Sequence, residues 1–118
     1  MTCTIDMKKL SWQESLNPKI NTKNIKTPGR WVAYIPISYA DNVWKKIDLA
    51  MKNGFIGYRA KISSPIFYTE HKRPVCCVLY IYTYDCNDLI DARRVREELR
   101  KLGFTHPIKY QSKEILIL

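Results

Sequence analysis

The segment VLYIYTYD constrains the fold most, because its side chains alternate between two chemical types. In a β-strand, successive side chains point to opposite faces of the sheet. Leu79 and Ile81 therefore share one face, and the opposite face receives Tyr80, Tyr82 and Tyr84. The pattern predicts a strand with an aliphatic side for a core. Its aromatic side has to be covered by another part of the chain or by a ligand.

Hydrophobic periodicity and turn residues predict the other elements. In chain order they are a strand in 30–37, a helix in 43–53, a strand in 57–64, the tyrosine strand, a helix in 89–102, and short strands in 106–111 and 114–118. Ser38 or Asp41 is the expected N-cap of the first helix, and Asn87 or Asp88 that of the second. This order predicts an α+β fold with both helices on one face of a mainly antiparallel sheet.

Residues 1–28 differ in composition from the rest of the chain. They are rich in Lys and Asn and contain Pro18 and Pro28, so we expect an irregular N-terminal arm. Residues 29–118 are expected to form a single α+β domain, because a chain of 118 residues is long enough for one core. The arm, with Trp12, is one candidate to cover the aromatic side of the sheet.

The charge balance is strongly basic, with 20 Lys and Arg against 11 Asp and Glu and a net charge of +9. Such a charge favours anionic partners. The sequence has neither an apolar run of about 18 residues nor a signal peptide, so we expect a cytoplasmic protein with no membrane segment. It also lacks a zinc-type Cys/His spacing, a Gly-rich phosphate loop and the HExxH and GxSxG motifs, so no metal and no cofactor is predicted.

The strand YRAKIS carries two cations that point to the same side of the sheet. Arg59 and Lys61 are two residues apart and could hold a phosphate through charge-assisted hydrogen bonds. The alternative is a solvated edge strand that its charges protect from aggregation. Lys72 and Arg73, in the basic loop TEHKRP, could close over the same ligand or simply form an exposed loop.

Further candidates come from the tyrosine strand and from its neighbours in the chain. Tyr80, Tyr82 and Tyr84 could stack on a base, although tyrosine is also a common residue on the wet side of a sheet. Arg93 could reach the rim of the sheet from the start of the second helix, where ion pairs along that helix are the alternative. Lys109, on the following strand, could border the same site.

The runs GRWVAYIP, DNVWKKIDLAMKNGFIGYRAKIS and LYIYTYD…DARRVREELRKLGF…PIKY resemble the Bles family, a basophilic-leukaemia-expressed protein and its microbial relatives. The order of elements matches over about residues 29–110. The resemblance implies a fold similar to that of the cap-binding translation initiation factor, a curved sheet backed by helices. The function of the family is unknown, so the resemblance implies no activity directly.

Microbial members of this family are in turn similar to phosphothreonine lyases, which use a histidine acid and a lysine base. By this likeness Lys72 corresponds to the base, and Lys61 stands where the histidine acid would be. A lysine ammonium can bind phosphate, but a pKa of about 10 makes it a poor proton donor at neutral pH. The likeness therefore implies phosphate binding more strongly than elimination chemistry.

We predict a small basic domain that binds a phosphorylated ligand on the open face of its sheet. RNA, a nucleotide and a phosphopeptide all fit. The predicted ligand-binding residues are Arg59, Lys61, Lys72, Arg73, Tyr80, Tyr82, Tyr84, Arg93 and Lys109. One alternative is a phosphothreonine-lyase-like enzyme with Lys72 as its catalytic base. The other is a protein-interaction module.

Overall fold

A computed structural model describes residues 10–67 and 74–112. Its strands, in chain order, are β1 (Trp12–Leu16), β2 (Gly29–Pro36), β3 (Arg59–Ser63), β4 (Ile66–Phe67), β5 (Pro74–Thr83) and β6 (Lys109–Ser112). Its helices are a short 3-10 helix (Thr22–Asn24), α1 (Ile37–Lys52) and α2 (Leu89–Lys101). The strand predicted at 114–118 lies outside the described residues.

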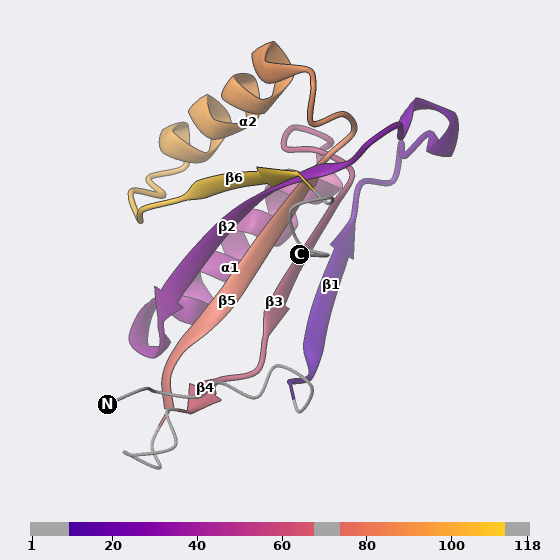
Figure 1. Cartoon of the computed structure of the whole chain (residues 1–118). Helices are drawn as coiled ribbons and strands as arrows, with labels where there is room; N and C mark the ends of the chain where they lie inside the picture. The colour runs from indigo at the N-terminus through magenta and orange to yellow at the C-terminus, as the bar shows by residue number, and fades with distance from the viewer. Residues whose placement is uncertain (1–9, 68–73, 113–118) are drawn as a thin grey trace.

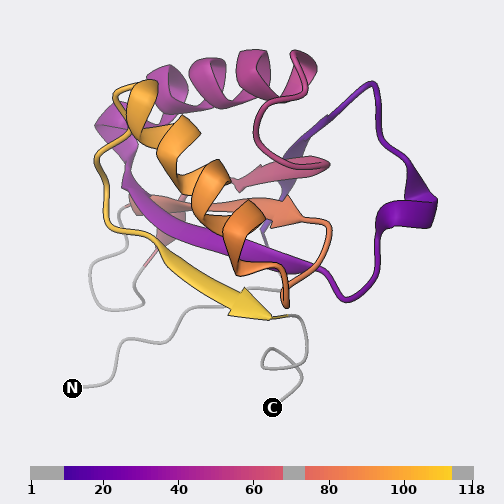
Figure 2. The ribbon, with the colours of Figure 1, turned by 90° about the horizontal axis from the view of Figure 1, so that it is seen from above.

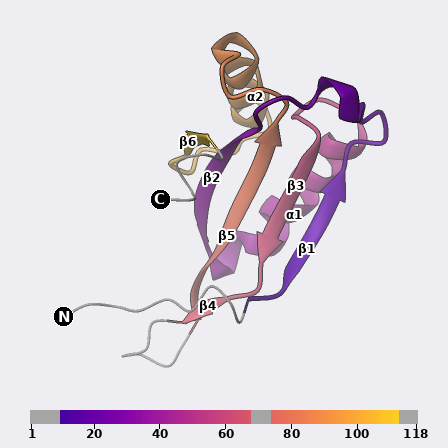
Figure 3. The ribbon, with the colours of Figure 1, turned by 45° about the vertical axis from the view of Figure 1, so that its right-hand side comes forward.

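The strands form one sheet in the order β1-β3-β5-β2-β6, with β4 beside β5, and every described pairing is antiparallel. Figure 1 and Figure 3 show β5 in the middle of a twisted sheet with α1 behind it. Seen from above, α1 and α2 lie on the same side (Figure 2). The predicted fold class, an α+β fold with a curved antiparallel sheet and two helices on one face, is confirmed. The closer likeness to the cap-binding factor stays a prediction.

Aliphatic side chains fill the space between the sheet and the helices. Leu79 and Ile81 of β5 are both buried there, on the side that the alternation predicted. The stripe that α1 contributes consists of Ala40, Val43, Ile47, Ala50 and Met51. Full burial of one such aliphatic side chain stabilises the fold by about 1.5–3 kcal/mol. This side of the sheet, which we call the helix face, therefore holds the main core.

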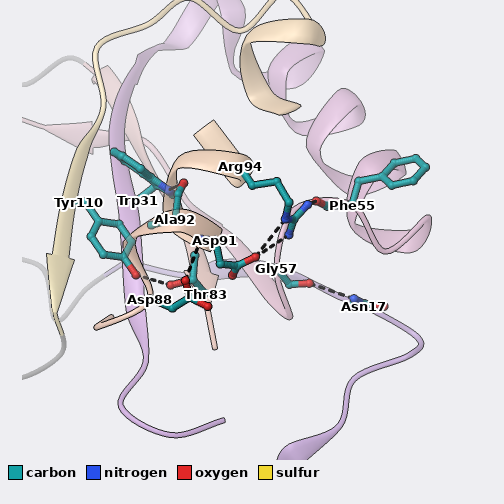
Figure 4. A network of polar contacts seen from close by, with 10 residues as sticks. All are labelled: Asn17, Trp31, Phe55, Gly57, Thr83, Asp88, Asp91, Ala92, Arg94 and Tyr110. Carbon is teal, nitrogen blue, oxygen red and sulfur yellow. Dashed lines mark hydrogen bonds and ion pairs between the residues drawn. The ribbon is translucent and has the colours of Figure 1, made fainter. Parts of the chain in front are cut away.

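Polar contacts fasten β2, β5, β6 and α2 to one another on the helix face (Figure 4). The indole nitrogen of Trp31 donates to the carbonyl oxygen of Ala92 at 3.0 Å, and the hydroxyls of Thr83 and Tyr110 are hydrogen-bonded. The rings of Trp31 and Tyr110 lie 4.9 Å apart. Both aromatic side chains therefore serve the packing of the helix face.

The residue before each of the two α-helices sets where that helix begins. α1 starts at Ile37, directly after Pro36 and without a side-chain cap, so the predicted caps Ser38 and Asp41 are wrong. Proline has no N–H for a strand ladder, and α1 follows at once where β2 ends. The predicted cap Asp88 is confirmed, since its side chain accepts a backbone hydrogen bond from the first turn of α2. Within 10–67 and 74–112, no helix is both long enough and apolar enough to cross a lipid bilayer.

Residues 12–16 form the regular edge strand β1, where the sequence indicated an irregular arm. Tertiary contacts hold this polar segment. The Ser15 hydroxyl donates to Asp48 of α1 at 2.6 Å, and the Asn17 amide donates to the carbonyl of Gly57 at 3.0 Å (Figure 4). Gly57 has φ +114, and a Cβ at this position would collide with the backbone of β5. The arm prediction is therefore wrong for these five residues, which belong to the sheet.

Candidate functional site

The side of the sheet opposite the helices carries tyrosines and cations, and we call it the tyrosine face. The strand registers place its residues on one side of five strands. Among them are Trp12 and Glu14 of β1, Arg59 and Lys61 of β3, Val78, Tyr80 and Tyr82 of β5, Arg30, Val32 and Tyr34 of β2, and Lys109 and Gln111 of β6.

Tyr80 lies at the centre of this face and is only 7% exposed. The Trp12 ring stacks on it, with ring centroids 5.4 Å apart and 19° between the planes. The guanidinium carbon of Arg30 lies 3.6 Å from the Tyr80 ring centroid. In the sheet, β2 lies next to β5 on one side and β1 lies beyond β3 on the other, so these two groups approach the ring from opposite sides. Tyr80 thus occupies the predicted face, but Trp12 and Arg30 cover the ring that was expected to be open.

The two cations predicted from YRAKIS both turn toward the tyrosine face. The Lys61 ammonium lies 4.5 Å from the Trp12 ring centroid and 5.6 Å from that of Tyr80. The Arg59 guanidinium lies 5.4 Å from the Tyr82 ring centroid and forms an ion pair with Glu14. The charge of Arg59 is therefore compensated, whereas Lys61 has no carboxylate partner in the described part of the chain.

Arg30 is a residue of this face that the sequence interpretation missed. Its Nη2 donates to Oε1 of Gln111 at 3.5 Å, a long contact to a neutral group, and its buried Nε has no partner among residues 10–67 and 74–112. The alternation of β2 contained the signal. With Trp31, Ala33 and Ile35 facing the helices, Arg30 has to face the other way. Arg30 and Lys61 thus flank the central tyrosine as two cations with no described carboxylate partner.

Tyr82 lies further along β5 and Tyr84 directly after its end, and both are half-buried. Tyr58 packs against both, with ring centroids 6.0 Å from Tyr82 and 5.2 Å from Tyr84. Burial raises the pKa of the Tyr58 hydroxyl, and the neighbouring Tyr82 adds to the increase. The Tyr58 hydroxyl therefore stays neutral at physiological pH. The rings of Tyr82 and Tyr84 are partly exposed and are available for stacking.

The remaining predicted site residues divide into three groups. Lys109 is exposed on the tyrosine face, at the β6 edge. Arg93 lies exposed on α2, in the layer that covers the opposite face of the sheet, so the fold does not bring it to the other cations. Lys72 and Arg73 lie outside the described residues. The lyase hypothesis, which needs Lys72 as its base, therefore stays a prediction.

A hollow of about 360 Å³ lies on the other side of the sheet, between α1 and the β1–β3 edge. Asp41, Trp44 and Cys77 contribute to its lining. Burial raises the pKa of the Cys77 thiol, which stays protonated at neutral pH and is a poor nucleophile. Within 10–67 and 74–112, no group of three His, Cys, Asp or Glu side chains could hold a metal ion. The hollow therefore adds no recognisable catalytic set to the site.

Together the fold and the tyrosine face define a class, a small α+β domain whose sheet face opposite the helices is aromatic and cationic, with a small buried cluster around Tyr80. The family model described as basophilic leukemia-expressed protein Bles03 matches residues 3–115, so the chain belongs to the Bles03 family, as the resemblance predicted. The comparison with curated proteins gave no match. The family description states no activity, so function has to be argued from the tyrosine face itself.

Proposed function

We propose that the tyrosine face binds single-stranded RNA. Arg30 and Lys61 contact its phosphates, and Tyr82 and Tyr84 stack on its bases. The observation that carries this proposal is the position of Arg30 and Lys61. Both lie beside the Tyr80 ring, and neither has a carboxylate partner in the described residues.

The surroundings of Arg30 and Lys61 differ from those of the ion-paired cations on α2. On α2, Arg94 pairs with Asp91 at 3.0 Å and Lys101 with Glu98 at 3.2 Å, which lowers the local field. The tyrosine-face cations lie instead over aromatic rings, a contact worth about 0.5–2 kcal/mol. A ring holds a cation in place without cancelling its charge, so these groups remain able to pair with a phosphate.

The mixture of rings and cations favours a nucleic acid over a phosphopeptide. A single strand repeats bases and phosphates, and its sequence-independent binders combine a basic groove with aromatic stacking worth about 1–3 kcal/mol per base. β5 has ten residues and spans about 33 Å, enough for several nucleotides. A phosphopeptide would use the cations but would leave the exposed surface of Tyr82 and Tyr84 without a role.

Fluorescence anisotropy with a short labelled RNA tests the proposal across a range of salt concentrations. Arg30→Gln and Lys61→Gln should each weaken binding about tenfold, the cost of losing one charge-assisted hydrogen bond to phosphate. Each should also reduce the slope of log K against log salt by about 0.7, because one fewer counterion is released from the single strand.

Lys45→Gln is the matched control, since Lys45 is exposed on α1 and its substitution removes the same charge from the other side of the molecule. Thermal unfolding of every variant separates lost binding from lost structure. An equal loss with Lys45→Gln, or tighter binding of a phosphopeptide than of RNA, contradicts the proposal. Association that does not respond to salt would instead favour the protein-interaction alternative. The cytoplasmic location stays a prediction from the sequence.

A further inference from the structure

A second feature of the tyrosine face lies where β6 leaves β2. The two strands pair only over Gly29–Val32 and Lys109–Ser112. Pro107 comes two residues before β6 and has no N–H with which to extend the ladder. The pairing therefore stops at Val32, and a hollow of about 370 Å³ lies next to the unpaired part of β2. Its lining consists of Val32, Tyr34, Pro107, Ile108, Lys109 and Gln111.

The lining combines apolar, aromatic and polar groups. Val32 and Ile108 provide apolar surface, and Tyr34 is 59% exposed, so its ring is open to a ligand. The Gln111 carbonyl oxygen accepts from Arg30, which leaves the amide nitrogen as a donor with no partner in the described residues. Lys109 is exposed at the same hollow. The volume lies within the range of about 300–1,000 Å³ that is usual for small-ligand sites.

We infer that this hollow holds one nucleobase of the bound strand. Tyr34 stacks on the base, the Gln111 amide donates to an acceptor on its edge, and Arg30 and Lys109 contact the phosphates on either side. This inference rests on the proposed RNA binding and adds to it a position at which base identity matters. Stacking on Tyr82 and Tyr84 tolerates any base, whereas a hydrogen bond from an oriented amide does not.

Charge and polarity favour a base over an apolar peptide side chain as the occupant. An apolar side chain would match Val32 and Ile108 but would desolvate the Gln111 amide without giving it an acceptor. It would also bring no anion to Lys109 or Arg30. A nucleotide brings a flat ring, edge acceptors and a phosphate together, which matches all three parts of the lining.

The test compares four homopolymeric RNAs with an abasic oligomer of the same length, by anisotropy. Tyr34→Ala should weaken binding of the preferred homopolymer by about fivefold or more, the loss of one stacked base, and should leave the abasic oligomer unchanged. Tyr34→Phe, which keeps the ring, should bind like the wild type. Gln111→Leu should make the affinities for the four homopolymers nearly equal. Because Tyr34 is largely exposed, its substitution should leave the thermal unfolding temperature close to that of the wild type.

The outcomes separate this inference from the RNA-binding proposal. If Arg30→Gln weakens binding of every oligomer but Tyr34→Ala and Gln111→Leu leave the order of the four homopolymers unchanged, the base site is wrong and phosphate binding stands. If the wild type binds neither the homopolymers nor the abasic oligomer, both are wrong. Equal affinity of the wild type for abasic and base-containing RNA also overturns the base site.

Discussion

Both faces of the sheet contain side chains of β5, but different interactions hold the two faces together. On the helix face, Leu79 and Ile81 are buried among aliphatic residues of α1 and α2. On the tyrosine face, Tyr80 is enclosed by an indole and a guanidinium, and Tyr82 remains half-exposed. The first face is covered by the helices, whereas the second buries only a small cluster with Val32, Val78 and Tyr80 and leaves Lys61 and Tyr82 partly exposed.

This difference makes the helix face the main source of stability and the tyrosine face the proposed source of binding. The helix face gains free energy from the apolar area that it removes from water, a term that does not depend on precise geometry. The tyrosine face gains less from area, but its cation–ring contacts hold Arg30 and Lys61 at fixed positions. Substitutions on the helix face should therefore cost more stability than substitutions on the tyrosine face, and the predictions below test that difference.

The largest expected effect is on the helix face. Leu79→Ala should lower the free energy of unfolding by about 2–5 kcal/mol, because the cavity it leaves lies in a closed aliphatic core. Tyr82→Ala, on the other side of the same strand, should cost about 1 kcal/mol, since part of that ring is already exposed. Urea denaturation followed by circular dichroism measures both. Equal losses would mean that the tyrosine face is as much a core as the helix face.

A smaller effect is expected where β1 meets the tyrosine face. Trp12→Ala removes the ring that stacks on Tyr80 and should destabilise the protein by about 1–2 kcal/mol, from lost stacking and from exposure of the tyrosine ring. Trp12→Phe should recover most of that loss. Hydrogen exchange should show faster exchange in β1 for the alanine variant, with β5 little changed. No change in β1 exchange would show that Ser15 and Asn17 hold the strand without the indole.

The contrast between the faces also explains which parts of the fold could be predicted from the sequence. The alternation around Leu79 and Tyr80 identified both faces of β5, because strand periodicity depends only on neighbouring residues. β1 was missed because WQESL has no apolar alternation. Its position depends on Ser15 and on Asn17, whose partners lie on α1 and next to β3. Contacts between residues this distant in the chain leave little trace in a local pattern.

The candidate site was predicted only in part for the same reason. Arg59 and Lys61 could be placed on one face from their spacing, and both reach the tyrosine face. The partners that decide their charge could not be predicted, because Glu14 reaches Arg59 only through the pairing of β1 with β3. To place Arg30 beside Tyr80, one would have to know that β2 lies next to β5. Strand order cannot be read from periodicity, and it determines which cations of residues 10–67 and 74–112 form an ion pair with a residue of a neighbouring strand, as Arg59 does with Glu14.

The smallest expected effect is a loss of stability at alkaline pH that originates on the tyrosine face. Burial raises the pKa of the Tyr80 hydroxyl, an effect that the charge of Arg30 partly offsets. Because the pKa is higher in the folded state, the neutral hydroxyl contributes fully to the free energy of unfolding below the ordinary tyrosine pKa of about 10. This contribution is lost as the pH rises through the pKa of the folded state. For one group the slope cannot exceed about 1.4 kcal/mol per pH unit. Urea denaturation from about pH 8 to about pH 11 should show this decline, and Tyr80→Phe should make it shallower.

Tyr110 gives the matched comparison on the helix face, because burial also raises its pKa while the hydrogen bond with Thr83 lowers it. Tyr110→Phe should likewise make the alkaline decline shallower, without any change in RNA affinity. Tyr80→Phe keeps the ring between Trp12 and Arg30, so it should also preserve RNA binding at neutral pH. A decline that is unchanged in Tyr80→Phe would show that the Tyr80 hydroxyl reaches water, and the tyrosine face would then be more open than its contacts indicate.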